Sequence, residues 1–475
     1  MKKLTIFAVA ALVALGARAD KIALLNGTIV NPSDGKIVSN ANVIIDGERI
    51  ITVSGGNEAK APDGARVFDC AGKFILPGYI DTHIHFFQSG DLFTRPDAAD
   101  FTKIRPYADE VAWIKSHLND VFARYVRCGI TSVVDVGGPM WNFDVRKIAN
   151  LTAKAPRVAV AGPLISSVSR PQLNLGDPPI VQVNTPDDAR AMVRTLAAKT
   201  PDYIKIWFIV DPEHPVEKFR PIVHAVVDES HARKLRVAVH ATELEAARTS
   251  VEEGADLLVH SVTDKPVDEA FVRLLKEKRT ILCPTLVVFE RYGRTFANKL
   301  NLTPEEKAWG NPEVIASLDV TKIPSDQLPE RVKKALENPD AVLDRIQHTY
   351  DVALKNLKIL EDAAIPIAAG TDAGNIGTIH GPALFREFQL MRDAGLTPMQ
   401  ILQCATSNAA RVFATPRSGV LDENGNPQIG SVVPGNFADL VILNSNPASD
   451  IAHASDIESV IKNGTVYDAA ALLPK

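Results

Sequence analysis

Asp81-Thr82-His83-Ile84-His85 is the stretch of sequence that decides the predicted fold. It lies near the end of an apolar segment, residues 74–86, that is typical of a buried strand. Side chains alternate along a strand, so His83 and His85 lie on the same face. In a barrel of parallel strands that face is the interior, and the carboxyl end of the strand lies at the catalytic mouth. Two imidazoles placed there can bind one metal ion, although a His-x-His pair alone is a weak signal.

Seven more apolar segments follow this one along the chain, several with helical stretches between them. Ala246 to Gly254 is such a stretch, with a glycine at its end. The remaining predicted strands cover residues 131–136, 157–164, 203–208, 236–241, 257–261, 280–288 and 365–371. Eight β/α units predict an α/β fold of the (β/α)8 TIM barrel type. The alternative, a doubly wound open sheet, would show a glycine-rich phosphate turn after an early strand, and none is seen.

Both ends of the chain carry short apolar runs separated by turns such as Asp34-Gly35 and Asp46-Gly47. They predict a small composite β-sandwich domain built from the two termini. The predicted divisions are residues 20–75 for its first part, 76–415 for the barrel and 416–475 for its second part. Residues 290–339 interrupt the barrel with polar, Pro-rich and Asn-rich sequence after the seventh strand. That position suits a lid or specificity loop, and a decorative or dimerising insertion is the alternative.

Residues 1–19 have the pattern of a cleavable signal peptide. Lys2 and Lys3 precede the apolar run from Ile6 to Leu15, and Ala17-Arg18-Ala19 fits the cleavage site. The run is too short for a retained membrane anchor, which needs about 20 apolar residues. We therefore expect a periplasmic or secreted protein, with no membrane span after signal cleavage.

The composition narrows the class of protein further. Apolar residues make up 46% of the chain and charged residues 23%, which permits a large core. The net charge of −5 disfavours a nucleic-acid partner, and a small-molecule substrate is expected. A homo-oligomer is compatible with this composition. The four cysteines are scattered, without the Cys-x-x-Cys spacing of a zinc knuckle, and we expect core cysteines at positions 70, 128, 283 and 404.

Other ligand-type residues fall at the ends of later predicted strands. His240 and His260 end the fifth and sixth strands, and Asp372 follows the eighth. Lys205 lies inside the fourth strand, where a buried amine is costly unless it is paired or modified. Each residue alone could be a satisfied core side chain or a helix cap. Together with the His83 and His85 pair, however, they converge on one face of the predicted barrel.

This pattern resembles the amidohydrolase superfamily over nearly the whole mature chain. Within it, the sequence is similar to the imidazolonepropionase-related branch that includes Xaa-Pro dipeptidases. The motifs that carry the resemblance are Leu76-Pro77-Gly78, the six residues named above, Ile204-Lys205-Ile206, Gly381, Phe385-Arg386-Glu387, Ala405-Thr406-Ser407-Asn408-Ala409-Ala410, Gly430-Ser431, Pro434-Gly435-Asn436 and Ala438-Asp439-Leu440.

The resemblance implies two divalent metal ions, usually Zn²⁺. His83, His85 and Asp372 would bind the more buried ion, and His240 and His260 the second. Lys205 would bridge them as a carbamate formed with carbon dioxide. An unmodified Lys205 amine beside a single metal ion is the alternative.

The implied reaction is hydrolysis of an amide or peptide bond in a dipeptide or N-acyl amino acid. A metal-bridging hydroxide would attack, with Asp372 as acid and base. The alternatives are hydrolysis of a cyclic amide, lactone, carbamate or phosphoester, or a periplasmic metal-binding or solute-binding protein without turnover.

Four further residues are candidate substrate contacts: Arg170, Arg291, Tyr292 and His380. They follow predicted strands three, seven and eight, where the catalytic mouth lies, although structural roles explain them as well. Two stretches depart from the dipeptidases. Residues 166–171 lack the Gly-Gly-His that those enzymes tend to carry, and residues 134–138 lack their Arg-Asp. The metal chemistry is therefore better supported than the dipeptidase specificity.

Overall fold

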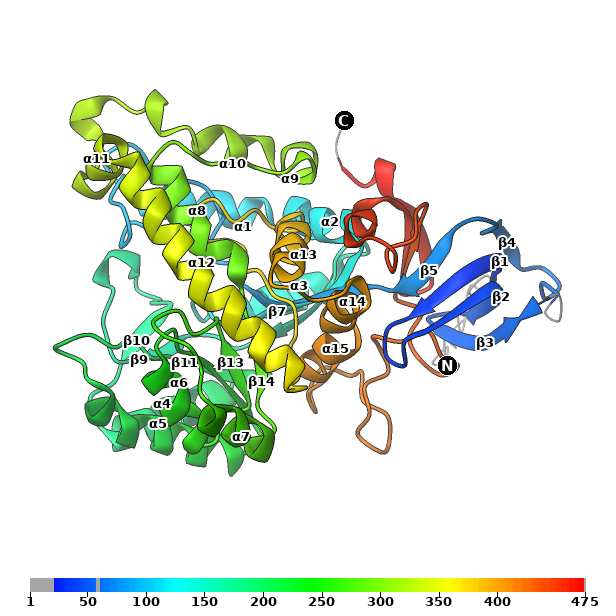
Figure 1. The fold of residues 1–475 in the computed structure, drawn as a ribbon, viewed down its shortest axis with the longest axis horizontal. Coiled ribbons are helices and arrows are strands. Elements are labelled where there is room, and N and C mark those ends of the chain that lie inside the picture. The colour runs from blue at the N-terminus through cyan, green and yellow to red at the C-terminus, as the bar shows by residue number, and fades with distance from the viewer. Residues whose placement is uncertain (1–20, 57–59, 474–475) are drawn as a thin grey trace, which may run out of the picture.

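A computed structural model describes residues 21–56 and 60–473 of the 475-residue chain. The predicted signal peptide lies outside these residues. Parallel strands form the centre of the molecule, with helices packed around them (Figure 1). The barrel strands are β6 (Tyr79–Ile84), β7 (Ile130–Asp135), β8 (Arg157–Val160), β11 (Tyr203–Trp207), β12 (Arg236–His240), β13 (Leu257–Val259) and β14 (Ile281–Cys283), and the short strands β9 (Leu164–Ser166) and β10 (Ile180–Gln182) extend the sheet beside β11. The predicted TIM-barrel fold is confirmed.

Residues 365–373 occupy the eighth position of the barrel without forming a regular strand. The Ala368 amide donates to the Leu282 carbonyl on β14, and the Thr82 amide donates to the Ala369 carbonyl. Isolated bridges join Leu282 to Ile367 and Ile84 to Ala373. The segment follows the path of the predicted strand, but it does not form a continuous ladder of hydrogen bonds. Pro366 contributes to this interruption because it has no amide hydrogen to donate. The segment still closes the ring between β14 and β6.

Several predicted strands are shorter in the structure, and two of them have a clear local cause. The segment 74–86 divides at Gly78 into β5 (Phe74–Pro77), which joins the terminal sheet, and β6. A side chain at Gly78 would collide with Thr131, since a Cβ there would lie 2.3 Å from its side-chain atoms. The segment 280–288 ends as a strand at Cys283, because Pro284 follows and α8 (Leu286–Phe296) begins soon after.

The polypeptide between strands forms the helical layer in the order that a β/α repeat requires. Asp268 caps the start of helix α7, where its side chain accepts the Phe271 amide hydrogen, and Thr185 caps the start of α4. The remaining helices of this layer are α1 (Tyr107–Ser116), α2 (Leu118–Arg127), α3 (Asn142–Leu151), α5 (Val216–His231), α6 (Leu244–Glu252), α12 (Pro339–Asp362), α13 (Ala383–Asp393), α14 (Pro398–Ala405) and α15 (Ser407–Phe413); α4 covers Pro186–Ala197 and α7 covers Glu269–Lys278.

Both ends of the described chain meet in one eight-stranded sheet, as the composite β domain requires (Figure 1). The strand order is β17-β16-β15-β5-β1-β2-β3, with β4 beside β1. The strands are β1 (Ile22–Asn31), β2 (Lys36–Asp46), β3 (Arg49–Gly55), β4 (Arg66–Asp69), β15 (Leu440–Leu443), β16 (Ile457–Lys462) and β17 (Thr465–Asp468). Their apolar side chains form a separate core, to which Leu24 of β1 and Leu440 of β15 both contribute.

The predicted insertion is helical and well packed. Between α8 and α12 it contains α9 (Pro304–Trp309), α10 (Pro312–Ser317) and α11 (Glu330–Glu337), at the upper left of Figure 1. Its apolar side chains form one cluster with Leu92 and Phe101 from the loop after β6. This contact places the insertion at the face of the barrel where the strands have their carboxyl ends, the position expected for a lid or specificity element.

Two further predictions concern the cysteines and membrane-spanning helices. All four cysteines are buried and unpaired, as core residues. No helix among the described residues is long and apolar enough to cross a membrane.

Candidate active site

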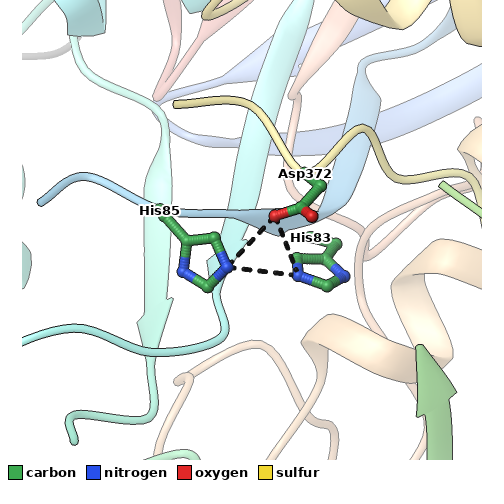
Figure 2. A group of neighbouring side chains, drawn as sticks. All are labelled: His83, His85 and Asp372. Carbon is green, nitrogen blue, oxygen red and sulfur yellow. Dashed lines mark hydrogen bonds and ion pairs between the residues drawn. The ribbon is translucent and has the colours of Figure 1, made fainter. Parts of the chain in front are cut away.

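Three predicted ligands meet at the carboxyl end of β6 and the segment that closes the barrel (Figure 2). The Oδ1 atom of Asp372 lies 3.3 Å from His83 Nε2 and 3.1 Å from His85 Nε2. The two Nε2 atoms are 3.4 Å apart. All three side chains are buried, and their nitrogen and oxygen atoms converge as the ligands of a divalent ion do.

Local backbone geometry holds these ligands in place. His85 donates from Nδ1 to the Gly137 carbonyl at 2.6 Å, which leaves Nε2 facing the cluster. Asp372 has a φ of +61°, an unfavourable conformation for a residue with a side chain. The Asp81 carboxylate accepts from the Thr371 hydroxyl at 2.7 Å and from the Thr371 amide at 3.1 Å. Asp81 therefore ties the Asp372 segment to β6.

His240 and His260 lie beside the first three ligands. The ring centroids of these two histidines are 4.3 Å apart, and that of His260 is 5.0 Å from His83. His260 Nδ1 makes a 2.6 Å hydrogen bond with the Thr285 hydroxyl, which fixes the ring. Burial holds the pKa values of His83, His240 and His260 well below their usual range. Neutral imidazoles are the form that binds a metal ion.

Lys205 is buried on β11 and faces the same cavity. Its Nζ atom has no hydrogen-bond partner among the described residues. Burial lowers the pKa of Lys205 to about 7. An ammonium group would be poorly accommodated here, whereas a neutral amine or a modified one fits the site.

A cavity of about 410 Å³ opens above these six residues. Its walls combine apolar and cationic side chains. The apolar group includes Phe87, Leu164, Ile180, Trp207 and Phe289, and the cationic group consists of Arg95, Arg170 and Arg331. A volume of this size suits a small molecule.

A hydrogen-bonded chain connects Asp372 to one of the cationic residues. Asn375 Nδ2 donates to Asp372 Oδ1 at 2.7 Å. Asn375 Oδ1 accepts from the Tyr292 hydroxyl and, at 2.8 Å, from Arg95 Nη1. Arg95 also pairs with Asp97, 2.7 Å away. These hydrogen bonds orient the Asp372 carboxylate from outside the His83–His85–Asp372 cluster.

The four candidate substrate contacts divide into two pairs. Tyr292 and Arg170 line the cavity. Arg291 points away from it, because its fully buried guanidinium donates to Glu306 of α9 at 2.7 Å. Arg291 therefore anchors the insertion, and this corrects its prediction as a substrate contact.

His380 also lies outside the cavity. Its Nε2 donates to the Gln88 carbonyl, and its Nδ1 accepts from the Tyr125 hydroxyl, both at 2.8 Å. With both ring nitrogens occupied inside the core, His380 has no donor or acceptor left for a substrate, which corrects the second prediction. The sequence signal for His380 is its position after the eighth predicted strand, and that position does not show which way the side chain points.

The amidohydrolase family model matches residues 74–467. The chain belongs to the amidohydrolase family. Curated relatives include a 5-methylthioadenosine/S-adenosylhomocysteine deaminase of Bacillus cereus, 23% identical over 479 residues, covering 94% of this chain and 93% of that protein. Membership of the amidohydrolase family supports a hydrolytic enzyme that acts on C–N bonds.

Solved structures of low sequence identity share the fold of this amidohydrolase. A Xaa-Pro dipeptidase with bound methionine in its active site is 22% identical, with a TM-score of 0.69, covering 94% of this chain and 100% of that one. The ochratoxinase of A. niger is 18% identical, with a TM-score of 0.69 and coverage of 95% and 96%. A molinate hydrolase is 20% identical, with a TM-score of 0.70 and coverage of 96% and 97%.

The donor set fits the divalent metal ions that amidohydrolases generally use. Imidazole nitrogens and a carboxylate oxygen form the His83–His85–Asp372 cluster, and two more imidazoles adjoin it. Several residues around them carry no recognisable sequence motif: Gln88, Arg95, Asp97, Trp207, Arg331 and Asn375.

Proposed function

We propose that this amidohydrolase hydrolyses an amide or peptide bond in a small molecule of the dipeptide or N-acyl amino acid type. The observation that carries the proposal is the convergence of His83, His85 and Asp372 at the floor of a cavity sized for a small molecule. His83, His85 and Asp372 would hold one divalent ion, and His240 and His260 a second. We propose Zn²⁺ for both. Bound there, the ions supply Lewis acidity and a water activated at neutral pH.

Lys205 is proposed as the bridging ligand in carbamylated form. The neutral amine nitrogen attacks carbon dioxide, a C–N bond forms, and the nitrogen loses a proton to solvent. The product carries two oxygen donors and one negative charge, whereas the free ammonium has neither. The buried Nζ atom, with no partner among the described residues, supports this role.

Asp372 is proposed as the general base and then the general acid. Its carboxylate would accept a proton from the attacking water and deliver it to the leaving nitrogen. Asn375 holds Oδ1 at 2.7 Å and would keep the carboxylate oriented through both transfers. Apolar side chains, among them Phe87 and Phe289, line the cavity and would limit the access of competing water to the reacting bond.

The test is metal analysis of the purified mature protein, combined with a hydrolysis screen of dipeptides and N-acyl amino acids. We expect two equivalents of metal, amide hydrolysis, and loss of activity after treatment with EDTA that added Zn²⁺ restores. Asp372→Asn should lower kcat by about 10²- to 10⁴-fold while most of the metal stays bound. Asp187→Asn, on the exposed surface of α4, is the matched control.

Two outcomes would contradict the proposal: hydrolysis that is insensitive to EDTA, or an active Asp372→Asn variant with its full metal content. The screen also includes cyclic amides, lactones and carbamates as alternative substrates.

Deamination of a purine nucleoside is a second candidate function, because the curated Bacillus cereus relative that covers 94% of this chain is a deaminase. Ammonia release from 5-methylthioadenosine, without cleavage of any amide in the screen, would favour it over the first proposal.

We also propose that the enzyme is exported to the periplasm or beyond the cell, on the pattern of residues 1–19. Amino-terminal sequencing of the protein recovered from the periplasmic and extracellular fractions tests this. A start near residue 20 is expected, and an intact Met1 in the cytoplasmic fraction would contradict it.

A further inference from the structure

Three guanidinium groups, those of Arg95, Arg170 and Arg331, gather around one turn of the chain at the wall of the cavity. Arg95 Nε and Nη2 each lie 2.7 Å from the two oxygens of Asp97. Arg170 Nε lies 3.6 Å from Asp97 Oδ2, and Arg331 Nη1 donates to the neighbouring Ala98 carbonyl at 3.3 Å. All five residues line the cavity. The side chains therefore converge on a single turn, residues 97–98.

The Asp97 carboxylate neutralises the positive charge of Arg95, and the charges of Arg170 and Arg331 are not neutralised. Arg95 binds both oxygens of Asp97 through Nε and Nη2. Its Nη1 atom donates to Asn375 Oδ1 and to the Tyr292 hydroxyl. Arg170 reaches Asp97 only at 3.6 Å. For Arg331, the described residues offer no carboxylate within ion-pair distance. Two positive charges are thus in excess at this wall of the cavity.

Two separate parts of the chain supply these charges. Arg170 follows β9 and lies over the Trp207 ring, 4.9 Å from its centroid. Arg331 belongs to α11 of the insertion and lies 5.4 Å from the centroid of Phe296. Each guanidinium is thereby held by an aromatic face and keeps N–H groups for another partner. A substrate between them would touch both the barrel and the insertion.

We propose that Arg170 and Arg331 together bind the carboxylate of the substrate. The inference rests on the proposed amide hydrolysis and names its substrate class: a molecule whose leaving amine is an amino acid with a free carboxylate. The planar guanidinium fork matches a carboxylate geometrically. The apolar walls, including Trp207, Ile180 and Leu164, suit an apolar side chain on that amino acid. Arg331 gives the insertion a role in specificity.

Binding of unreactive product-like compounds tests the inference without turnover. The zinc-loaded enzyme is titrated calorimetrically with L-phenylalanine, L-leucine and L-methionine, and with the matching amino alcohols, which lack the carboxylate. We expect at least one amino acid to bind, and its alcohol to bind about tenfold or more weakly. Arg170→Met and Arg331→Met should each weaken binding of the amino acid about tenfold, and the double variant about a hundredfold. The affinity for the alcohol should stay within about threefold of wild type.

Hydrolysis supplies a second readout. For N-acetyl-L-phenylalanine, N-acetyl-L-leucine and N-acetyl-L-methionine, the same variants should raise KM with little change in kcat. The corresponding C-terminal carboxamides should be poor substrates of wild type, with a KM that the variants do not change. Arg345→Met, an exposed position on α12, is the matched control. Compared with the Met variants, Arg170→Lys and Arg331→Lys should recover part of the affinity, because lysine restores the positive charge but not the planar, two-pronged geometry of the guanidinium group.

The inference is overturned if acids and alcohols bind equally, if none of the amino acids binds, or if the variants weaken both series to the same extent. Failure of the proposed function looks different: no amide in the screen is hydrolysed, although carboxylate binding still depends on Arg170 and Arg331. Circular dichroism and metal content of each variant show whether the fold and the metal site are retained.

Discussion

At the scale of single residues, Asn375 links Asp372, at the floor of the cavity, to Arg95 and Tyr292 in the cavity wall. Its amide group donates to the Asp372 carboxylate and accepts from Arg95 and Tyr292. It is 3% exposed, so water does not compete for these hydrogen bonds. The proposed acid and base role of Asp372 needs a fixed carboxylate, and Asn375 is the residue that fixes its Oδ1 atom from the substrate side.

Asn375→Ala should therefore impair catalysis more than binding. We expect kcat to fall by about tenfold to a hundredfold, because small misplacement of a reacting group carries such a cost. KM and metal content should change little. Steady-state kinetics and metal analysis of the same preparation provide the measurement, with Asn424→Ala in an exposed loop as control. An Asn375→Ala enzyme with wild-type kcat would show that the hydrogen bond does not position Asp372.

The predicted metal ligands could be placed from the sequence because a simple rule governs them. Ends of parallel barrel strands meet at one face, so ligand-type residues at those ends converge, as His83, His240 and Asp372 do in the structure. No such rule places Arg331 or Asn375. They reach the cavity from an insertion and a loop, whose paths depend on tertiary packing rather than on local periodicity.

At the scale of elements, helix α8 depends on a carboxyl group from another helix. The two oxygens of Glu387 on α13 accept the amide hydrogens of Leu286 at 2.9 Å and Val287 at 2.8 Å. These amides belong to the first turn of α8 and have no partner inside the helix. Since α8 carries Phe289 and Tyr292 into the cavity, Glu387 helps to set the cavity wall.

Glu387 should also make stability depend on pH. Burial raises the pKa of Glu387 to about 8, against the effect of its two amide donors. Its contribution to stability is therefore full below the unfolded pKa of about 4.5 and is lost as the pH rises through about 8. Glu387→Gln removes this titration. Relative to the variant, wild type should lose on the order of 3 kcal/mol of unfolding free energy between pH 5 and pH 8.

Urea unfolding across this pH range measures the effect, because the difference between the two proteins isolates Glu387 from other titrating groups. Glu277→Gln, exposed on α7, should keep the wild-type pH profile. Parallel profiles for wild type and Glu387→Gln would contradict the assignment.

The sequence patterns predict which segments form strands more accurately than they predict where each strand ends. The predicted strand 280–288 stops at Cys283, and the remaining residues begin α8. A short apolar run has the same composition in a buried strand and in a buried helix, so periodicity cannot separate them. Closure of the barrel by residues 365–373 also depends on contacts with both neighbouring strands, which no local pattern records.

At the scale of the whole molecule, a buried ion cluster joins the barrel to the terminal sheet. Asp439 precedes β15 and accepts from Arg157 Nε of barrel strand β8 at 2.8 Å. Lys462 Nζ on β16 lies 3.5 Å from the other carboxylate oxygen, and the Asp439 carbonyl accepts from the Gly78 amide at the start of β6. Asp439 and Lys462 side chains are 2% and 1% exposed. One residue thus connects three parts of the fold.

Asp439→Asn should destabilise the whole protein, since it leaves the Lys462 ammonium buried without its counter-charge. Burial already lowers the pKa of Lys462 to about 8 despite Asp439, which shows how costly that position is for a cation. Breaking a buried pair from one side costs about 3–5 kcal/mol of unfolding free energy, and denaturant unfolding measures the loss. Glu423→Gln in an exposed loop is the control. Adding Lys462→Met to Asp439→Asn should recover part of the loss, because the unpaired charge is then absent. If the single variant instead unfolds at the wild-type denaturant concentration, the cluster does not hold the barrel and the sheet together.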